Sequence, residues 1–335
     1  MKKLAIGVDI GGINTAFGLV DENGDLYAES VISTKKYPYV DDYPAYVEDL
    51  CDSMRALAQS LSFEYELTGI GIGAPNANYH KGTIETPANL WKFKEGDPNP
   101  DESRRLFPLA DDIGRCFGGV KVLVTNDANA ATIGEMIYGN AKGMRDFIMI
   151  TLGTGLGSGF VANGEMVYGH DGFAGEFGHI PFFDNEIICS CGKKGCLETE
   201  VSGIAIEDKM CHLIQKGVNT ILKEKYDQQR TIHIDDIITA AKNDDNLSIE
   251  LIEEAGEKVG KAVAFLINTF NPETVIVGGN LAAAGDYIML PLKSATNKYS
   301  LNLVYKDTKF RVSKMTENAN AWGVAMLIRN KIIGL

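Results

Sequence analysis

The fold is decided by the stretch Leu4-Ala5-Ile6-Gly7-Val8-Asp9-Ile10-Gly11-Gly12, in which alternating apolar residues lead into an aspartate and a pair of glycines. The alternation predicts a buried β-strand, and the glycines predict a tight turn after it. Residues 15–20 continue as a second strand, and the run Asp21-Glu22-Asn23-Gly24 is typical of a hairpin turn. A strand therefore brings the Asp9 carboxylate to a turn whose backbone amides a ligand can approach closely.

The same arrangement recurs about 140 residues further along the chain. Residues 147–152 predict a strand, residues 153–157 a glycine turn and residues 159–161 a second strand. Amphipathic helices are predicted within 47–61, 233–242 and 248–270. We interpret the pattern as an internally duplicated α/β unit with a cleft between the copies, in which ligands bind at the carboxyl ends of the strands.

The bulk composition is that of a globular protein, since 45% of residues are hydrophobic and 23% are charged. A length of 335 residues suits two domains. We predict a small N-terminal α/β domain over 1–125, joined by a C-terminal helix at about 318–335. The large α/β domain is predicted over 126–317.

The net charge of −13 argues against binding along a nucleic acid, which requires a basic surface. No apolar run approaches the roughly 20 residues that span a bilayer, so we expect no membrane association. Asp9 ends the first apolar stretch too early for a secretion signal. We therefore expect a cytoplasmic protein.

Two glycine-rich turns are candidates for binding the phosphates of a nucleotide. In the first, Asp9-Ile10-Gly11-Gly12-Ile13-Asn14-Thr15, the glycine amides can contact phosphate oxygens and Asp9 could hold a Mg²⁺-bound water. An ordinary hairpin turn is the alternative for this stretch alone. The second, Thr151-Leu152-Gly153-Thr154-Gly155, offers further amide and hydroxyl donors. Two such loops at equivalent points of a duplicated unit can hold one polyphosphate from both sides. Neither is a Walker A loop, because no Gly-Lys-Ser/Thr follows.

A third motif, Thr125-Asn126-Asp127-Ala128-Asn129, lies between a predicted strand at 120–124 and an alanine-rich helix. The simpler interpretation is helix N-capping by Asn126 or Asp127. The sharper hypothesis makes Asp127 a general base, because a sugar hydroxyl must lose its proton as the new P–O bond forms. Asn126 would then hydrogen-bond the neighbouring hydroxyls, and capping is compatible with this role.

One histidine and three of the six cysteines cluster within 18 residues of each other. The spacing Cys189-Ser190-Cys191, followed by Cys196, can close a tetrahedral Zn²⁺ site with His179. Unliganded thiols that cluster by coincidence are the alternative. Because the protein would fill all four positions, the zinc would be structural, and it would hold Glu176, His179 and Glu198 as a wall around a sugar.

A last and weaker motif is Gly278-Gly279, which follows a predicted strand at 274–277 and could provide a flat surface for an adenine ring. Together these motifs resemble the ROK family of sugar kinases and sugar-responsive repressors over nearly the whole chain. The zinc signature is the most specific part of the resemblance, from Gly172 to Glu198. The resemblance implies the duplicated actin/hexokinase-like (ribonuclease H-like) two-domain fold with an interdomain cleft, and a zinc-binding insertion at about 170–200.

The resemblance also implies roles for single residues. Asp127 would be the base, and the sugar would contact Asn126, Glu176, His179 and Glu198. The segment Asn89-Leu90-Trp91 is similar to the substrate-side loop of the family, which implies that Asn89 binds substrate. The remaining assignments follow the motifs: Asp9, Gly11, Gly12, Asn14, Thr15, Gly153, Thr154, Gly155, Gly278 and Gly279 for the nucleotide, and His179, Cys189, Cys191 and Cys196 for zinc.

Two positions depart from the family pattern. Ile13 stands where the family usually has threonine, so a hydroxyl donor is lost that Asn14 or Thr15 could replace. Asn76 stands where the family usually has glycine after a proline, and asparagine tolerates the left-handed conformation better than most residues. The Asn76 side chain could reshape the sugar pocket, which leaves the identity of the hexose open.

We therefore predict an enzyme that transfers the ATP γ-phosphate to the 6-hydroxyl of glucose, with Mg²⁺ and a structural Zn²⁺. A kinase of the same family for an N-acetylhexosamine, mannose or fructose is the nearest alternative. A sugar-responsive transcriptional regulator is another, but its helix-turn-helix would precede the first loop, and only eight residues precede Asp9. The resemblance implies a homodimer or homotetramer.

Overall fold

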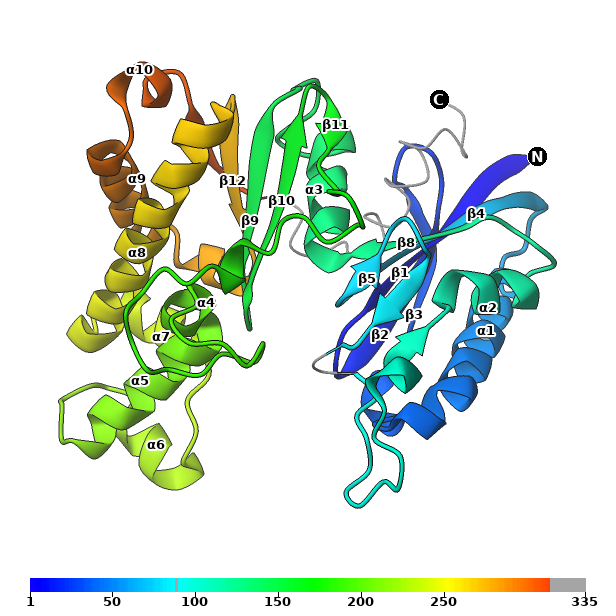
Figure 1. Ribbon diagram of the computed structural model, residues 1–335, viewed down its shortest axis with the longest axis horizontal. Coiled ribbons are helices and arrows are strands. Elements are labelled where there is room, and N and C mark those ends of the chain that lie inside the picture. Colours follow the sequence, from blue (N-terminus) through cyan, green and yellow to red (C-terminus); the bar gives the residue numbers. More distant parts are fainter. Residues whose placement is uncertain (88–89, 314–335) are drawn as a thin grey trace. The chain divides into compact units, whose positions relative to one another are not determined.

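The protein is described here from a computed structural model, which covers residues 1–87 and 90–313. The described residues form two compact units, with α/β structure in each (Figure 1). Unit 1 consists of Met1–Gly143 and Met166–Ala174. Unit 2 consists of Met144–Glu165 and the described residues from Gly175 onward. The predicted C-terminal helix at about 318–335 and the candidate residue Asn89 lie outside the described residues.

Unit 1 contains a five-stranded sheet in the order β3-β2-β1-β4-β8. Its strands are β1 (Lys2–Ile10), β2 (Asn14–Val20), β3 (Leu26–Ser33), β4 (Tyr65–Ala74) and β8 (Val122–Asn126). Neighbours among β1, β2 and β3 are antiparallel, whereas β1, β4 and β8 run parallel to one another. The carboxyl ends of β1, β4 and β8 therefore meet at one edge of the sheet.

The side chains of β1 point alternately to the two faces of the sheet, and each face is covered by different helices of unit 1. Ile6 faces a core that contains Leu50 and Ile113, whereas Ala5 faces a second cluster next to Ile137. Helices α1 and α2 thus cover one face of the sheet and α3 the other (Figure 1). The helices and short turns are α1 (Tyr43–Gln59), α2 (Leu109–Cys116), α3 (Asp127–Ile137), η1 (Thr34–Lys36), η2 (Val40–Asp42) and η3 (Glu102–Arg105). A small separate sheet is formed by β5 (Ala77–Asn78), β6 (Thr83–Glu85) and β7 (Leu106–Phe107).

Unit 2 contains a second five-stranded sheet, in the order β11-β10-β9-β12-β13. Its strands are β9 (Phe147–Leu152), β10 (Leu156–Ala162), β11 (Glu165–Met166), β12 (Thr274–Gly278) and β13 (Lys309–Val312). As in unit 1, an antiparallel hairpin is followed by two parallel strands on the other side of its first strand. The matching strand orders confirm the duplicated α/β fold that the sequence predicts.

The helices of unit 2 include the two that the sequence predicts, α7 and α8. All are α4 (Glu198–Val201), α5 (Gly203–Gln215), α6 (Lys223–Gln229), α7 (Ile234–Lys242), α8 (Asn246–Phe270), α9 (Asp286–Tyr299), α10 (Asn302–Tyr305), η4 (Phe177–His179) and η5 (Asn280–Ala284). Helices α8 and α9 approach closely, because a Cβ atom on Gly260 would lie 2.2 Å from the Leu292 carbonyl oxygen. No helix among the described residues has the length and apolar character that a membrane span requires.

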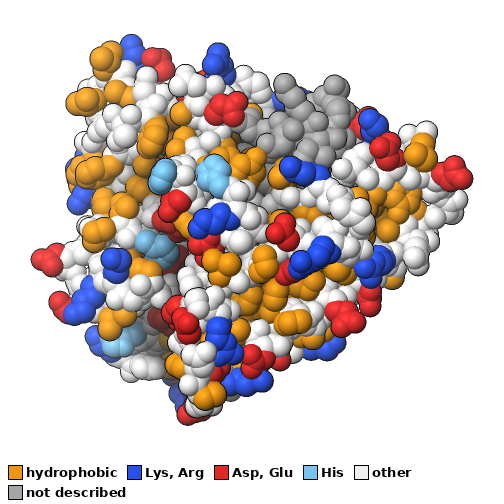
Figure 2. All heavy atoms as spheres, turned by 45° about the vertical axis from the view of Figure 1, so that its right-hand side comes forward, with side chains coloured by type: hydrophobic (Ala, Val, Ile, Leu, Met, Phe, Trp, Pro, Cys, Tyr) orange, Lys and Arg blue, Asp and Glu red, His pale blue; other side chains and the backbone are white. Residues whose placement is uncertain are grey.

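The surface carries charge of both signs. On the face shown in Figure 2, Lys and Arg side chains are interspersed with Asp and Glu.

Candidate active site

The strand register of unit 1 brings Asp9 and Asp127 together. In the parallel sheet Asp9 pairs with Gly73, and Gly73 pairs with Thr125, two residues before Asp127 at the start of α3. A Cβ atom on Gly73 would lie 3.9 Å from Asp9 Oδ1 and 3.7 Å from the Asp127 Cα atom. The bare backbone of Gly73 thus adjoins both Asp9 and Asp127, two acids that are far apart in the sequence and close enough for the charge of Asp127 to act on Asp9.

The environment of this carboxylate pair disfavours negative charge. Burial, and then the neighbouring charge of Asp127, raise the pKa of Asp9 to about 6. Asp127 is accessible to solvent, but the protein around its carboxyl group replaces much of the bulk water, and this desolvation raises its pKa. No lysine or arginine among the described residues forms an ion pair with either carboxylate. A donor set of two carboxylates without a cation fits Mg²⁺ and its water shell.

Asn126 is the N-cap of α3, as the simpler interpretation of its motif predicts. Its Oδ1 accepts a hydrogen bond of 2.9 Å from the Ala128 amide. Asp127 Oδ1 accepts from the same amide at 2.8 Å. The cap fixes where β8 ends and α3 begins, and with it the position of the Asp127 carboxylate.

The first glycine loop joins β1 to β2 and is closed by a hydrogen bond of 2.9 Å from the Gly11 amide to the Asn14 carbonyl. Gly12 and Asn14 are exposed, and Ile13 is 67% exposed. Thr15, in contrast, is fully buried: its Oγ1 lies 2.8 Å from the Tyr46 hydroxyl and 2.8 Å from Thr34 Oγ1. The Thr15 hydroxyl therefore faces the interior of unit 1, where its hydrogen bonds hold the end of the loop.

The second glycine loop, Gly153–Gly155, joins β9 to β10 in unit 2. It is closed by a hydrogen bond of 3.0 Å from the Gly153 amide to the Gly155 carbonyl, and Thr154 is exposed. The Gly278-Gly279 pair lies beside it, because Gly278 pairs with Thr151 across the β12–β9 ladder. Gly279 has a φ of +84°, and a Cβ atom there would lie 2.2 Å from the Leu152 carbonyl oxygen. Only glycine allows this approach of the two strand ends.

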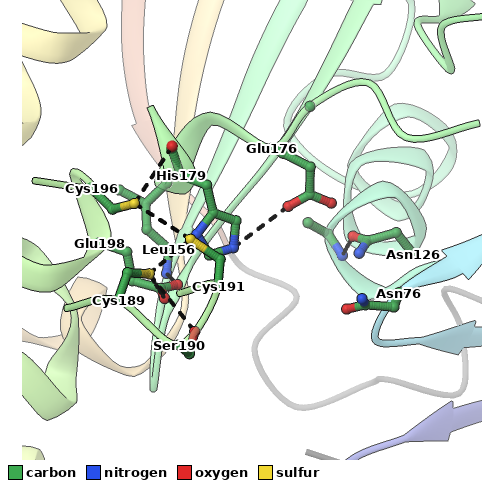
Figure 3. A network of polar contacts seen from close by, with 12 residues as sticks. Asn76, Asn126, Leu156, Glu176, His179, Cys189, Ser190, Cys191, Cys196 and Glu198 are labelled. Carbon is green, nitrogen blue, oxygen red and sulfur yellow. Dashed lines mark hydrogen bonds and ion pairs between the residues drawn. The ribbon is translucent and has the colours of Figure 1, made fainter. Parts of the chain in front are cut away.

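The predicted metal ligands converge in unit 2 (Figure 3). One ligand atom from each of four residues lies within 4.8 Å of the others, from His179, Cys189, Cys191 and Cys196. Cys189 Sγ lies 3.4 Å from His179 Nδ1, and Cys191 Sγ lies 3.6 Å from Cys196 Sγ. Zn–S bonds of about 2.3 Å at tetrahedral angles place two sulfurs about 3.8 Å apart, so the cluster fits a zinc ion.

Two carboxylates adjoin this cluster. Glu176 Oε2 lies 3.8 Å from His179 Nε2, the ring nitrogen opposite the one that faces Cys189. Glu198 Oε1 lies 3.8 Å from Cys189 Sγ (Figure 3). A carboxylate behind a histidine ligand fixes the tautomer and the orientation of the ring.

Two positions that shape the site, Gly73 and Tyr46, are not among the predicted site residues. Gly73 leaves room for both acids, and the alternation Gly69-x-Gly71-x-Gly73 on one strand was a signal for a bare strand face. Tyr46, which reaches Thr15, gives no local signal, because it reads as an ordinary apolar position of α1.

Comparison with known proteins places the chain in a family. A model of the ROK family matches residues 5–331. A glucokinase of Halalkalibacterium halodurans is 31% identical over 97% of this chain and 95% of its own length. The structure of a ROK family glucokinase from Streptomyces griseus in complex with glucose and AMPPNP is similar with a TM-score of 0.77, at 28% identity over 98% of this chain and 99% of that one. A ROK family transcriptional regulator, a homologue of the E. coli MLC protein, has a TM-score of 0.86 at 26% identity, over 99% of this chain and 79% of that one. This chain belongs to the ROK family.

Proposed function

We propose that this protein is a glucokinase, which transfers the γ-phosphate of ATP to the 6-hydroxyl of glucose. The observation that carries the proposal is the carboxylate pair Asp9 and Asp127 at the carboxyl ends of parallel strands. The support from outside the site is the match to glucokinases along almost their full length. Phosphoryl transfer to an alcohol requires one carboxylate that accepts the hydroxyl proton and a second carboxylate that attracts a cation.

Asp127 is the proposed general base. As the sugar oxygen bonds to the γ-phosphorus, the hydroxyl proton passes to the Asp127 carboxylate, and the bond from the γ-phosphorus to the bridging oxygen of ADP breaks. The raised pKa of Asp127 makes its carboxylate a better proton acceptor. Asn126 uses its Oδ1 in the cap, which leaves its amide group to donate to a neighbouring hydroxyl. Asn89 is proposed as a further hexose ligand.

The first loop is proposed to bind the phosphates. Gly12 and Asn14 would contact phosphate oxygens, and Asp9 would hold a water of the magnesium ion. Gly11, whose amide bonds the Asn14 carbonyl, would lie against the phosphates as the bare backbone of the turn. When bound with ATP, Mg²⁺ neutralises phosphate charge and polarises the γ-phosphoryl group. Thr15, which the sequence placed among the nucleotide ligands, is proposed to act by supporting this loop, because its hydroxyl is engaged inside unit 1.

Unit 2 is proposed to supply the other nucleotide contacts. The Gly155 amide and the Thr154 hydroxyl would donate to phosphate from this tight turn, on which Thr154 is exposed. Gly153, whose amide bonds the Gly155 carbonyl, would shape the turn that presents these donors. Gly278 and Gly279 lie beside this loop and would face the adenosine. Both assignments agree with ligand binding at the carboxyl ends of strands.

A structural zinc ion is proposed for the cluster of His179, Cys189, Cys191 and Cys196, whose ligand atoms fit its geometry. His179 Nδ1 would bind the metal, so that its Nε2–H can donate to Glu176 or to a sugar hydroxyl. Glu176 and Glu198 would accept hydrogen bonds from the hydroxyls of the hexose.

The proposal is tested by a coupled assay of ADP release across a panel of sugars: glucose, mannose, fructose, N-acetylglucosamine and N-acetylmannosamine. We expect the highest kcat/KM for glucose. If another sugar of the panel is preferred, the protein is still a sugar kinase, but its substrate is not glucose. If no sugar stimulates ADP release above the rate without sugar, the proposed activity is wrong.

A transcriptional regulator is the second candidate, because a ROK family regulator has a fold very similar to that of this chain. We propose that this protein does not bind nucleic acid and assembles as a homodimer or homotetramer. A gel-shift assay with sheared DNA, with and without glucose, tests the first statement, and light scattering after gel filtration tests the second. A glucose-dependent DNA shift would favour the regulator.

A further inference from the structure

Glu198, at the start of α4, lies between the metal cluster and the second glycine loop (Figure 3). Its Oε2 accepts a hydrogen bond of 2.8 Å from the Leu156 amide, directly after the loop. Its Oε1 lies 3.8 Å from Cys189 Sγ. One carboxylate thus touches both features, one with each oxygen.

The carboxylate occupies space that only a glycine at position 155 leaves open. A Cβ atom on Gly155 would lie 2.3 Å from Glu198 Oε2, well inside van der Waals contact. The glycine therefore serves a second purpose besides exposing its amide. It lets the Glu198 carboxylate lie against the backbone of the loop.

The segment that begins with Glu198 also holds the other end of the loop. The Gly203 amide donates a hydrogen bond of 2.7 Å to the Gly153 carbonyl, and a Cβ atom on Gly203 would lie 2.8 Å from that oxygen. The same segment follows Cys196 after a single buried residue, Leu197. Residues 198–203 therefore bracket the loop at both ends, and their own position depends on a cysteine of the metal cluster.

We propose that Glu198 is a positioning residue for nucleotide binding: it is held by the metal cluster through Cys196, two residues before it, and its carboxylate fixes the direction of the amides of the Gly153–Gly155 loop. This inference rests on the proposed function and extends it, because the metal cluster then affects the nucleotide as well as the hexose. The Leu156 amide is held by Glu198 and the Gly153 amide by the Gly155 carbonyl, which leaves the amides of Thr154 and Gly155 to face a ligand.

The test measures binding of the nucleotide analogue AMPPNP with Mg²⁺ by calorimetry in the absence of any sugar. Glu198→Ala removes a charge-assisted hydrogen bond to the loop, and we expect binding at least about tenfold weaker. Glu198→Gln keeps an acceptor oxygen for the Leu156 amide and should recover part of the loss. A role confined to hexose contact would leave AMPPNP affinity in both variants at the wild-type value.

Glu200 provides a matched control on the same helix. Its carboxylate accepts from Asn185 Nδ2 at 2.6 Å and from Lys258 Nζ at 2.6 Å, with no hydrogen bond to the glycine loop among the described contacts. Glu200→Ala removes a half-buried acid and its hydrogen bonds, as Glu198→Ala does. We expect its AMPPNP affinity to stay within about twofold of wild type.

A second variant tests the same contact from the side of the loop. Gly155→Ala places a methyl group where the carboxylate lies, so one of them must move, and AMPPNP binding should weaken. In the double variant Gly155→Ala/Glu198→Ala the clash is absent, so the combined loss should be much smaller than the product of the two single losses. Zinc content is measured for each protein, and we expect Gly155→Ala to keep its metal.

The outcomes separate the inference from the function on which it rests. If wild-type protein binds no AMPPNP, the proposed kinase activity fails. If wild-type protein binds it and both Glu198→Ala and Gly155→Ala bind equally well, the positioning role is wrong. The positioning role is also wrong if the loss of AMPPNP affinity in the double variant equals the product of the two single losses. If Glu198→Ala loses its metal, the AMPPNP affinity of Gly155→Ala, which keeps its metal, tests the positioning role.

Discussion

Asp9 and Asp127 both lie next to Gly73, whose missing side chain leaves room for the Asp9 carboxylate and for the backbone of Asp127. The two acids come from different strands, β1 and the end of β8, and the parallel register aligns them. Like charges repel each other, and the charge of Asp127 contributes, after burial, to the raised pKa of Asp9. The pair is therefore costly in the unliganded protein and suited to a cation.

Because ionised Asp9 destabilises the folded protein, its replacement by asparagine should change how the free energy of unfolding depends on pH. The pKa of Asp9 is raised from 3.8 to about 6 in the folded protein, so its stabilising contribution is complete below pH 3.8 and is lost as the pH rises through 6. From about pH 7.5 to about pH 5, wild-type protein should gain about 1 kcal/mol in free energy of unfolding from this group. Asp9→Asn should not gain it.

Urea titrations of the ligand-free protein at both pH values measure this difference. Asp25→Asn is the control, because Asp25 is an exposed acid in the same unit, and its curve should follow wild type. An Asp9→Asn variant with the same pH dependence as wild type would show that Asp9 remains ionised throughout.

Asp127→Asn should separate binding from chemistry. Asparagine keeps an oxygen that can accept from the Ala128 amide, so the start of α3 should be preserved. It cannot take the hydroxyl proton, and kcat should fall by about a thousandfold. The dissociation constant for glucose, measured by calorimetry, should change by less than about threefold.

Asp111→Asn, an exposed acid in the first turn of α2, is the control and should retain wild-type turnover. Near-normal turnover of Asp127→Asn would mean that another group accepts the proton.

The sequence was sufficient for features that depend on local patterns. The alternation before Asp9 predicts β1, and the glycines after it predict the turn, because period two and the absence of Cβ atoms are local properties. The three cysteines and His179 predict a metal cluster, because thiolate chemistry restricts what such a set can do.

Features that depend on contacts between distant segments could not be predicted in the same way. The hydrogen bond from the Leu156 amide to Glu198 joins a backbone group to a side chain 42 residues away, and a backbone amide leaves no mark on the sequence. Helix α9 contains Pro291, which argues against a helix locally. Its packing on α8 at Gly256 and Gly260 outweighs that preference.

The Tyr46 hydroxyl should support the first glycine loop through Thr15. Tyr46→Phe removes a buried hydrogen bond of 2.8 Å and leaves the ring packing against Trp91 in place. We expect a loss of about 1 kcal/mol in the free energy of unfolding and a raised KM for ATP. Tyr39→Phe, at a site that is 38% exposed, is the control and should change neither quantity. If Tyr46→Phe has the wild-type free energy of unfolding and KM for ATP, the loop does not need the hydrogen bond between Tyr46 and Thr15.

Replacement of one cysteine of the metal cluster should remove the metal and loosen the wall that it holds. Cys196 is fully buried and lies 3.6 Å from Cys191, so Cys196→Ser deprives the ion of a thiolate that serine cannot replace. Mass spectrometry of the metals in purified protein should find about one zinc per wild-type chain and almost none in Cys196→Ser. The melting temperature should fall together with the metal content, because binding free energy at a structural site contributes to folding. Cys211→Ser, in α5 and outside the cluster, should keep both the zinc and the melting temperature. A wild-type chain without zinc, and with the same melting temperature as Cys196→Ser, would show that the thiols are held together by the fold alone.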